Sequence, residues 1–175
     1  VLAADAIIVA APVYVLGPTG QLKNFIDRQL PMALPFMAEN TDGTGSGSHP
    51  MRYDMEGQRH VLISTCGFYS AEKNYDSVCS MFDHFCGKGK YETIFCGQGE
   101  LFHVKELSQR TDEYLSLCRR AGQEFAADRI SAETKAELAR LLFPKQVFET
   151  MADASWGVDR ETGEKESAAL SFTRQ

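Results

Sequence analysis

The sequence predicts an α/β domain built on a parallel β-sheet. Three apolar runs, at residues 6–11, 60–65 and 91–96, show no regular alternation with polar residues. Such runs are typical of strands that are covered on both faces, as parallel strands are. Segments with helical periodicity separate the runs, which is the pattern of strands joined by crossover helices. At 175 residues, 43% of them hydrophobic, the chain is long enough for one ordinary core.

The first predicted strand leads directly into a loop and a helix. Pro12 ends the strand, because proline donates no hydrogen bond to a neighbouring strand and restrains the residue before it. Residues 17–20 (Gly-Pro-Thr-Gly) then open a helix, with Thr19 as its cap. Apolar side chains recur at helical spacing and predict a core-facing stripe, formed by Leu22, Phe25, Ile26 and Gln29 or Leu30. Because open α/β sheets bind ligands at the carboxyl ends of their strands, we expect this loop to contribute to a ligand site.

Residues 40–50 are rich in glycine, serine and threonine. This composition is that of a flexible surface loop. A lid or an edge of the ligand site is the alternative interpretation.

The second strand, residues 60–65, is followed by a turn of small and aromatic residues, Thr65-Cys-Gly-Phe-Tyr69. Gly67 would let the backbone approach a flat ligand closely, which a side chain would prevent. The alternative is a plain turn in which Ser70 caps the next helix. That helix is predicted over residues 70–85 and has one apolar face, formed by Tyr75, Val78, Cys79, Phe82 and Phe85 or Cys86.

The third strand, residues 91–96, ends in the glycine-rich turn Gly97-Gln-Gly-Glu100. Such a turn can cradle an anion, but this one lacks the full spacing of a dinucleotide-binding fingerprint. Thr111 is the expected cap of the next, long helix. The buried stripe of that helix is predicted to be Tyr114, Leu117, Cys118, Ala121 and Phe125.

A further helix is predicted from Ser131 to Pro144, followed by a second apolar cluster at Val147, Phe148, Met151 and Trp156. This cluster either covers the core of the domain or forms a dimer surface. The charged and small residues after Gly157 predict a disordered tail.

Composition excludes several classes of function. The formal charge is −6 and no basic patch dominates, which argues against a nucleic-acid partner. No stretch approaches the apolar length of a membrane span, and no signal peptide is visible. The five cysteines form no Cys-x-x-Cys pair, so no metal site is expected. They fit reduced thiols of a cytoplasmic protein.

One segment resembles a known family. Ala11-Pro-Val-Tyr14, Thr19, Gln21-Leu-Lys23 and Ile26-Asp-Arg28 resemble the third strand, flavin loop and third helix of the NAD(P)H-dependent FMN reductases. That family includes the WrbA-like quinone reductases and the iron–sulfur flavoproteins. The resemblance implies a flavodoxin-like fold, in which the three apolar runs are strands three to five. Residues 1–130 would then be a partial FMN-binding domain, 131–156 a helical extension and 157–175 the tail.

The resemblance also implies a function. It implies an oxidoreductase that carries FMN, uses NAD(P)H as substrate, passes hydride or electrons to a quinone or other small molecule, and forms dimers or larger homo-oligomers. The alternatives are a flavodoxin-type electron carrier and a non-catalytic fragment that has lost its flavin. No acid–base residue is assigned, because the flavin carries the chemistry. The implied FMN contacts are Pro12, Val13, Tyr14, Val15, Leu16, Gly17, Thr19, Thr65, Cys66, Gly67 and Phe68.

In the flavodoxin-like order, the strand at residues 6–11 is central. The first two strands and the phosphate loop of that fold have no counterpart here, so this apolar strand is expected to be an exposed edge. Only Asp5, at its start, carries the charge that commonly protects such edges. We therefore expect the full protein to carry about 70 to 80 further residues upstream, the length of two βα units.

Overall fold

The computed structural model describes residues 1–40, 43–45, 47–159 and 161–164. The chain divides into two units, Val1–Leu142 and Phe143–Gln175. The first unit contains the β-sheet and all of the predicted site residues, and the described residues of the second include one helix.

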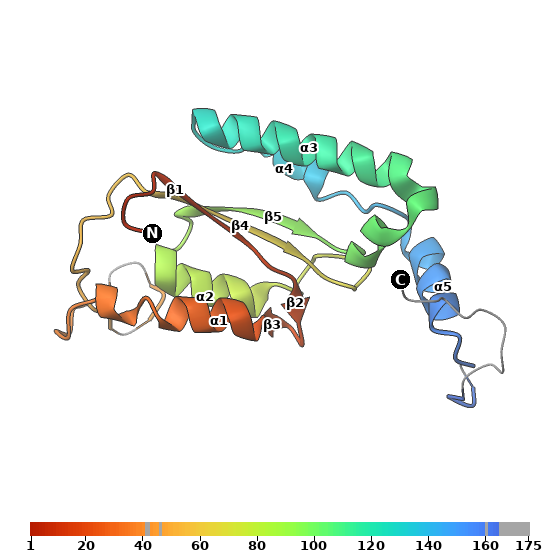
Figure 1. Cartoon of the computed structure of the whole chain (residues 1–175), viewed down its shortest axis with the longest axis horizontal. Helices are drawn as coiled ribbons and strands as arrows, with labels where there is room; N and C mark the ends of the chain where they lie inside the picture. The colour runs from red at the N-terminus through yellow and green to blue at the C-terminus, as the bar shows by residue number, and fades with distance from the viewer. Residues whose placement is uncertain (41–42, 46, 160, 165–175) are drawn as a thin grey trace. The chain divides into compact units, whose positions relative to one another are not determined.

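The sheet has three parallel strands in the order β1 (Ala6–Ala10), β4 (Arg59–Thr65) and β5 (Tyr91–Cys96) (Figure 1). The register places Ile8 beside Val61, and Ile63 beside Ile94. All three predicted strands are confirmed to within one residue at each end. Their order is the one expected for strands three to five of a flavodoxin-like sheet.

Helices cover both faces of the sheet. α1 (Gly20–Asp27) and α2 (Asp76–Cys86) lie on one face, and α3 (Ser108–Ala127) and α4 (Ala132–Leu138) lie on the other (Figure 1). Short 3₁₀ turns occur at Leu30–Met32, Gly99–His103 and Lys105–Leu107. The predicted α/β class with a parallel sheet is therefore confirmed.

The core on the α2 face forms where α2 packs against β4 and β5. Leu62, Val78 and Phe82 are each 1–2% exposed and belong to one cluster. Tyr75 stacks on Phe95 with ring centroids 4.1 Å apart. Each residue of this size contributes roughly 1.5–3 kcal/mol when it is fully buried.

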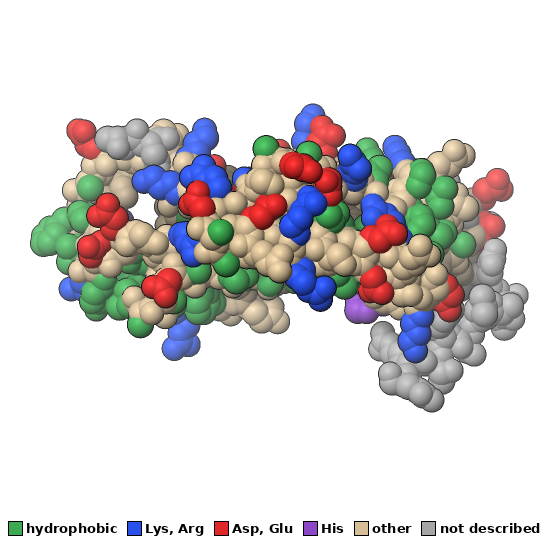
Figure 2. Space-filling view, turned by 90° about the horizontal axis from the view of Figure 1, so that it is seen from above, with side chains coloured by type: hydrophobic (Ala, Val, Ile, Leu, Met, Phe, Trp, Pro, Cys, Tyr) green, Lys and Arg blue, Asp and Glu red, His purple; other side chains and the backbone are tan. Residues whose placement is uncertain are grey.

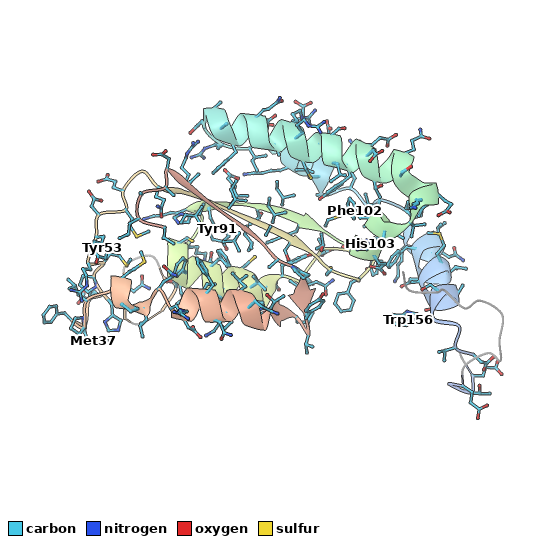
Figure 3. All side chains as sticks on the ribbon, in the orientation of Figure 1. Met37, Tyr53, Tyr91, Phe102, His103 and Trp156 are labelled. Carbon is cyan, nitrogen blue, oxygen red and sulfur yellow. The ribbon has the colours of Figure 1, made fainter. Side chains whose placement is uncertain are left out.

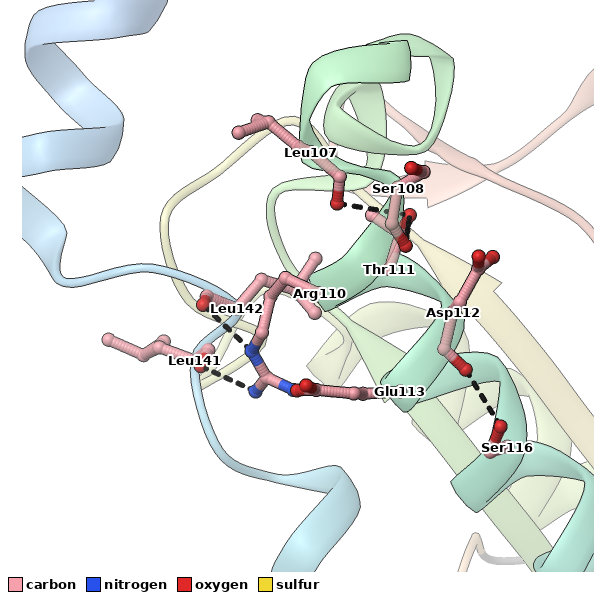
Figure 4. A network of polar contacts seen from close by, with 9 residues as sticks. All are labelled: Leu107, Ser108, Arg110, Thr111, Asp112, Glu113, Ser116, Leu141 and Leu142. Carbon is pink, nitrogen blue, oxygen red and sulfur yellow. Dashed lines mark hydrogen bonds and ion pairs between the residues drawn. The ribbon is translucent and has the colours of Figure 1, made fainter.

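Two arginines attach α3 at its ends. Near the start, Arg110 donates to the carbonyl oxygens of Leu141 and Leu142, at 3.2 and 3.1 Å, and pairs with Glu113 (Figure 4). Near the end, the Arg59 guanidinium lies 4.8 Å from the centre of the Phe125 ring. These contacts join the start of α3 to the segment after α4, and its end to the first residue of β4.

Several helix boundaries differ from the prediction. α2 begins at Asp76 rather than Ser70, because Ser70 instead accepts a hydrogen bond from Glu72 N in a turn that contains Lys73 at φ 60°. α3 begins at Ser108, so Thr111 lies inside the helix and its hydroxyl donates back to the Ser108 carbonyl. α4 ends at Leu138, well before Pro144.

The predicted cap at Thr19 is confirmed, since its hydroxyl oxygen accepts a hydrogen bond from Leu22 N. Ser131, predicted only as the start of its helix, caps that helix in the same way through Thr134 N. The predicted stripe of α1 is only partly buried, however: Phe25 is 46% exposed, and no described residue of α1 is fully buried.

The described residues between 33 and 51 form an arm rather than a plain loop. Ala38 and Ser48 exchange backbone hydrogen bonds of 2.9 Å, and a second bridge joins Ala33 to Met51. Met37, on this arm, and Tyr53, just after it, are 76% and 45% exposed (Figure 3). Hydrophobic side chains gather at the left of Figure 2, on the side where Figure 1 places this arm. Residues 41, 42 and 46 of the predicted loop lie outside the described part.

β1 is an exposed edge, as the sequence predicts. Within the described residues it pairs with β4 alone. Ile8 is 62% exposed, whereas its neighbour on β4, Val61, is 4% exposed. On the face of the sheet that these two side chains share, the helices therefore cover β4 but not β1. Unpaired backbone groups beside apolar side chains are a template for association.

The second unit contains α5 (Lys145–Trp156), which ends at Gly157 in the left-handed conformation, φ 57°. Trp156 is 76% exposed. Of the predicted tail, residues 160 and 165–175 lie outside the described part. Among the described residues, no helix has both the length and the apolar character needed to cross a membrane.

Ile8→Lys should reduce self-association with little loss of stability, because it adds charge to an exposed edge strand. Light scattering against protein concentration would measure this, alongside the thermal midpoint. The matched control is Leu115→Lys, which makes the same kind of change at a side chain that is 50% exposed on α3. An equal effect of the two variants would contradict a specific role of the edge.

Candidate functional site

The loops that follow β1 and β4 lie side by side at the carboxyl edge of the sheet. Ala11 N donates to the Ile63 carbonyl at 3.1 Å, and Ser64 Oγ donates to the Ala11 carbonyl at 2.6 Å. Val13 and Cys66 are buried in the same apolar cluster. The structure therefore brings the two predicted groups of site residues, within 12–19 and 65–68, to one place.

The first loop contains a hairpin that the sequence analysis missed. β2 (Val13–Tyr14) and β3 (Gly17–Pro18) pair antiparallel around a two-residue turn, Val15 and Leu16. Both turn residues have positive φ, 50° and 58°. Tight hairpins require this conformation and normally fill it with asparagine or glycine. A β-branched valine rarely adopts it, so neither residue signals a turn in the sequence.

The tip of this hairpin is apolar and exposed. Val15 is fully exposed, and Tyr14 and Leu16 are 65% and 49% exposed. Ser77, in the first turn of α2, donates a hydrogen bond to the Leu16 carbonyl and so fixes the strained turn. Thr19, on the far side of the hairpin, accepts from Leu22 N at 3.3 Å and begins α1.

The second loop has one buried side chain, followed by exposed residues. Cys66 is 4% exposed and points into the core, so only its backbone is available to a ligand at the surface. Phe68 and Tyr69 are 50% and 38% exposed. A Cβ placed on Gly67 would lie 3.5 Å from a Glu100 carboxylate oxygen.

The turn after β5 holds this loop in place. The backbone N–H of Gln98 donates to the Phe68 carbonyl at 2.7 Å, and that of Gly99 donates to the Cys66 carbonyl at 2.8 Å. Because these amides are engaged within the protein, they are not free to cradle an anion. The anion-binding interpretation of residues 97–100 is therefore not supported by the structure.

The titratable groups beneath the loops are buried and neutral at ordinary pH. Burial raises the pKa of the Cys96 thiol to about 11. It also raises the pKa of the Tyr75 and Tyr114 hydroxyls well above their usual range. Residues 11–20 and 65–69 contain no lysine, arginine, histidine or carboxylate. The site is therefore suited to holding a flat, largely apolar ligand and offers no acid–base pair of its own.

Comparison with known proteins identifies the segment that contains the first loop. Residues 1–41 match the model of the NADPH-dependent FMN reductase family. The matched segment includes β1, the hairpin and α1, so the resemblance seen in the sequence is confirmed there.

No curated protein matches the chain. Among solved structures, an FMN-dependent NADH-azoreductase from Bacillus anthracis, in complex with FMN, aligns with 15% identity and a TM-score of 0.38. The alignment covers 55% of this chain and 45% of the azoreductase chain. The chain thus spans less than half of that protein, and similarity at this level does not assign a function.

Val15→Asn combined with Leu16→Gly should raise the free energy of unfolding by about 1–3 kcal/mol, because both replacements suit positive φ. Urea denaturation would measure the change. The control is Val104→Asn, at a 37%-exposed valine with φ −93°, where no strain is relieved. If the variant is less stable than the parent, the contacts of the Val15 and Leu16 side chains stabilise the fold by more than the strain of their positive φ destabilises it.

Proposed function

We propose that this chain forms part of an FMN-dependent oxidoreductase that takes hydride or electrons from NAD(P)H and passes them to a quinone or another small acceptor. The observation that carries this proposal is the family match over residues 1–41, which contains one of the two loops of the candidate site. The free, largely buried thiols fit a reducing compartment, so we propose the cytoplasm as its location.

The residues present fit the ring system of FMN. Tyr14, Val15, Leu16 and Phe68 expose apolar surface at the carboxyl edge of the sheet, where a planar ligand would cover it. Within the described residues, the amides of Gly67 and Phe68 have no hydrogen-bond partner, so they can donate to acceptor atoms on a ring edge. The Thr19 oxygen accepts the capping hydrogen bond from Leu22 N, which leaves the hydroxyl proton able to donate to the ring as well.

The same loops supply no positive charge for the FMN phosphate. A phosphate is commonly held by positive charge or by a helix N-terminus with free amides. Residues 11–20 and 65–69 contain no lysine or arginine. We therefore assign only the ring contacts to these loops.

In this proposal FMN, when bound, supplies the hydride chemistry, and the protein supplies binding and orientation. Val13 and Cys66 fix the loops from below through the core. Tyr14 and Phe68 would pack on the ring and exclude water from it. No side chain is assigned to move a proton, because burial raises the pKa of the Tyr75 and Tyr114 hydroxyls and of the Cys96 thiol and keeps these groups neutral.

Titration of the purified protein with FMN and with riboflavin, which lacks the phosphate, tests the proposal. If the loops bind only the ring, the two flavins should bind with similar affinity. NAD(P)H oxidation with a quinone or ferricyanide should then accompany binding. Flavin binding without turnover would favour an electron carrier instead. Binding of neither flavin would favour a non-catalytic fragment and overturn the proposal.

Gly67→Val should weaken flavin binding about tenfold or more, because a branched side chain would stand where the backbone meets the ring. The thermal midpoint of the flavin-free protein should change much less. Gly122→Val on α3 is the control, since a Cβ there meets nothing within 4 Å. Unchanged flavin affinity in the Gly67 variant would remove the second loop from the site.

We also propose that the protein forms a homo-oligomer through the apolar residues of α5. Phe148 is buried, whereas Trp156 is 76% exposed and available to a partner. Trp156→Ala should weaken self-association, since large aromatic side chains dominate such interfaces. Sedimentation velocity over a range of concentrations would measure this. An assembly of unchanged affinity would exclude Trp156 from the interface.

A further inference from the structure

We propose that Gln98 is a positioning residue of the candidate site, one that fixes the Thr65–Tyr69 loop so that its free amides meet the ligand. The ligand in question is the flavin ring, so this inference rests on the proposed function. Gln98 lies on the turn after β5 and outside both loops that the sequence predicted.

Gln98 is among the most buried polar side chains of the described chain, at 1% exposure. Its backbone N–H donates to the Phe68 carbonyl at 2.7 Å, and its side-chain Nε2 donates to the Tyr69 carbonyl at 3.1 Å. Burial of an amide is unfavourable unless it makes hydrogen bonds. Here two of those bonds end on successive carbonyls of the same loop.

The turn is also pressed against the loop sterically. A Cβ on Gly97 would lie 2.9 Å from the Phe68 carbonyl oxygen, and one on Gly99 would lie 2.9 Å from Thr65 Cβ. Glycine on both sides allows this close approach. Gln98 itself has φ 59°, a conformation that favours glycine. A glutamine at such a position indicates that its side chain has a role that glycine cannot fill.

These contacts occupy carbonyl groups of the Thr65–Tyr69 loop and leave two of its amide groups able to bind a ligand. The carbonyls of Cys66, Phe68 and Tyr69 all accept hydrogen bonds from Gln98 or Gly99. Within the described residues, the amides of Gly67 and Phe68 donate to nothing. The hydrogen bonds from Gln98 and Gly99 therefore hold the amides of Gly67 and Phe68 in fixed places. Donors that are fixed in place bind a ligand more tightly than mobile ones.

Gln98→Met tests the inference, because methionine keeps the size of the side chain and removes its donor. Amide hydrogen exchange within residues 65–69 should become faster at Cys66, whose amide is hydrogen-bonded at 3.0 Å. Riboflavin affinity should fall about threefold to tenfold, the effect of one lost hydrogen bond. Gln98→Gly is the second variant. Glycine adopts the positive φ without strain and keeps the backbone hydrogen bond to the Phe68 carbonyl, so the fold should be retained. Only the side-chain hydrogen bond to the Tyr69 carbonyl is lost.

The matched control is Thr134→Val, which removes a buried hydroxyl at 0% exposure on α4, where it bonds Arg120 and Glu124. This variant should lower stability without changing exchange at residues 65–69 or riboflavin affinity. Equal exchange in the parent and both Gln98 variants would overturn the positioning role.

The two proposals fail separately. If the parent protein binds no flavin, the proposed function is overturned, and the exchange experiment still decides whether Gln98 holds the loop. If flavin binds and exchange becomes faster without any change in riboflavin affinity, the loop is held by Gln98 but the link to the ligand is overturned.

Discussion

The buried hydroxyl of Tyr75 is the contact on which the carboxyl edge of the sheet depends. It lies 3.1 Å from the Ser64 carbonyl and 3.0 Å from the Cys96 carbonyl, at the ends of β4 and β5. Both carbonyls lie where a strand gives way to a loop, and buried carbonyl groups need hydrogen-bond donors. The Cys96 carbonyl also accepts a hydrogen bond from Cys66 N at 3.0 Å. Burial also keeps the pKa of the hydroxyl high, so it remains a neutral donor. The second loop of the candidate site begins at the end of β4 fixed in this way, and the turn that contains Gln98 begins at the end of β5.

The strands could be predicted because their signal is local. Each is a short apolar run bounded by proline, glycine or polar residues. Because such strands are buried on both faces, apolar and polar residues do not alternate along them, and the run is easy to recognise. The cap at Thr19 was predictable for the same reason. The starts of α2 and α3 were not. Ser70 and Thr111 are good caps by type, but Ser70 lies in a tight turn and Thr111 in a helix that 3₁₀ turns lead into.

The candidate site was predictable in position but not in construction. Its loops follow apolar strands, and topology alone brings such loops together. The Val15–Leu16 hairpin was hidden because its residues contradict the preferences of the turn they form. The role of Gln98 could not be predicted, because a glutamine in a sequence does not by itself indicate a buried or a functional position. Only the flanking glycines marked its turn, and they serve close packing against a neighbouring loop rather than an anion.

The parallel pairing of β1 has a kinetic consequence. Ile8 and Val61, which lie side by side, are 53 residues apart in the chain, whereas Ile63 and Ile94 are 31 apart. Closing the longer loop costs more chain entropy, and β1 brings only a partly buried helix with it. The β4–α2–β5 segment should therefore fold first and serve as the template on which β1 docks. The first loop of the candidate site would then form last.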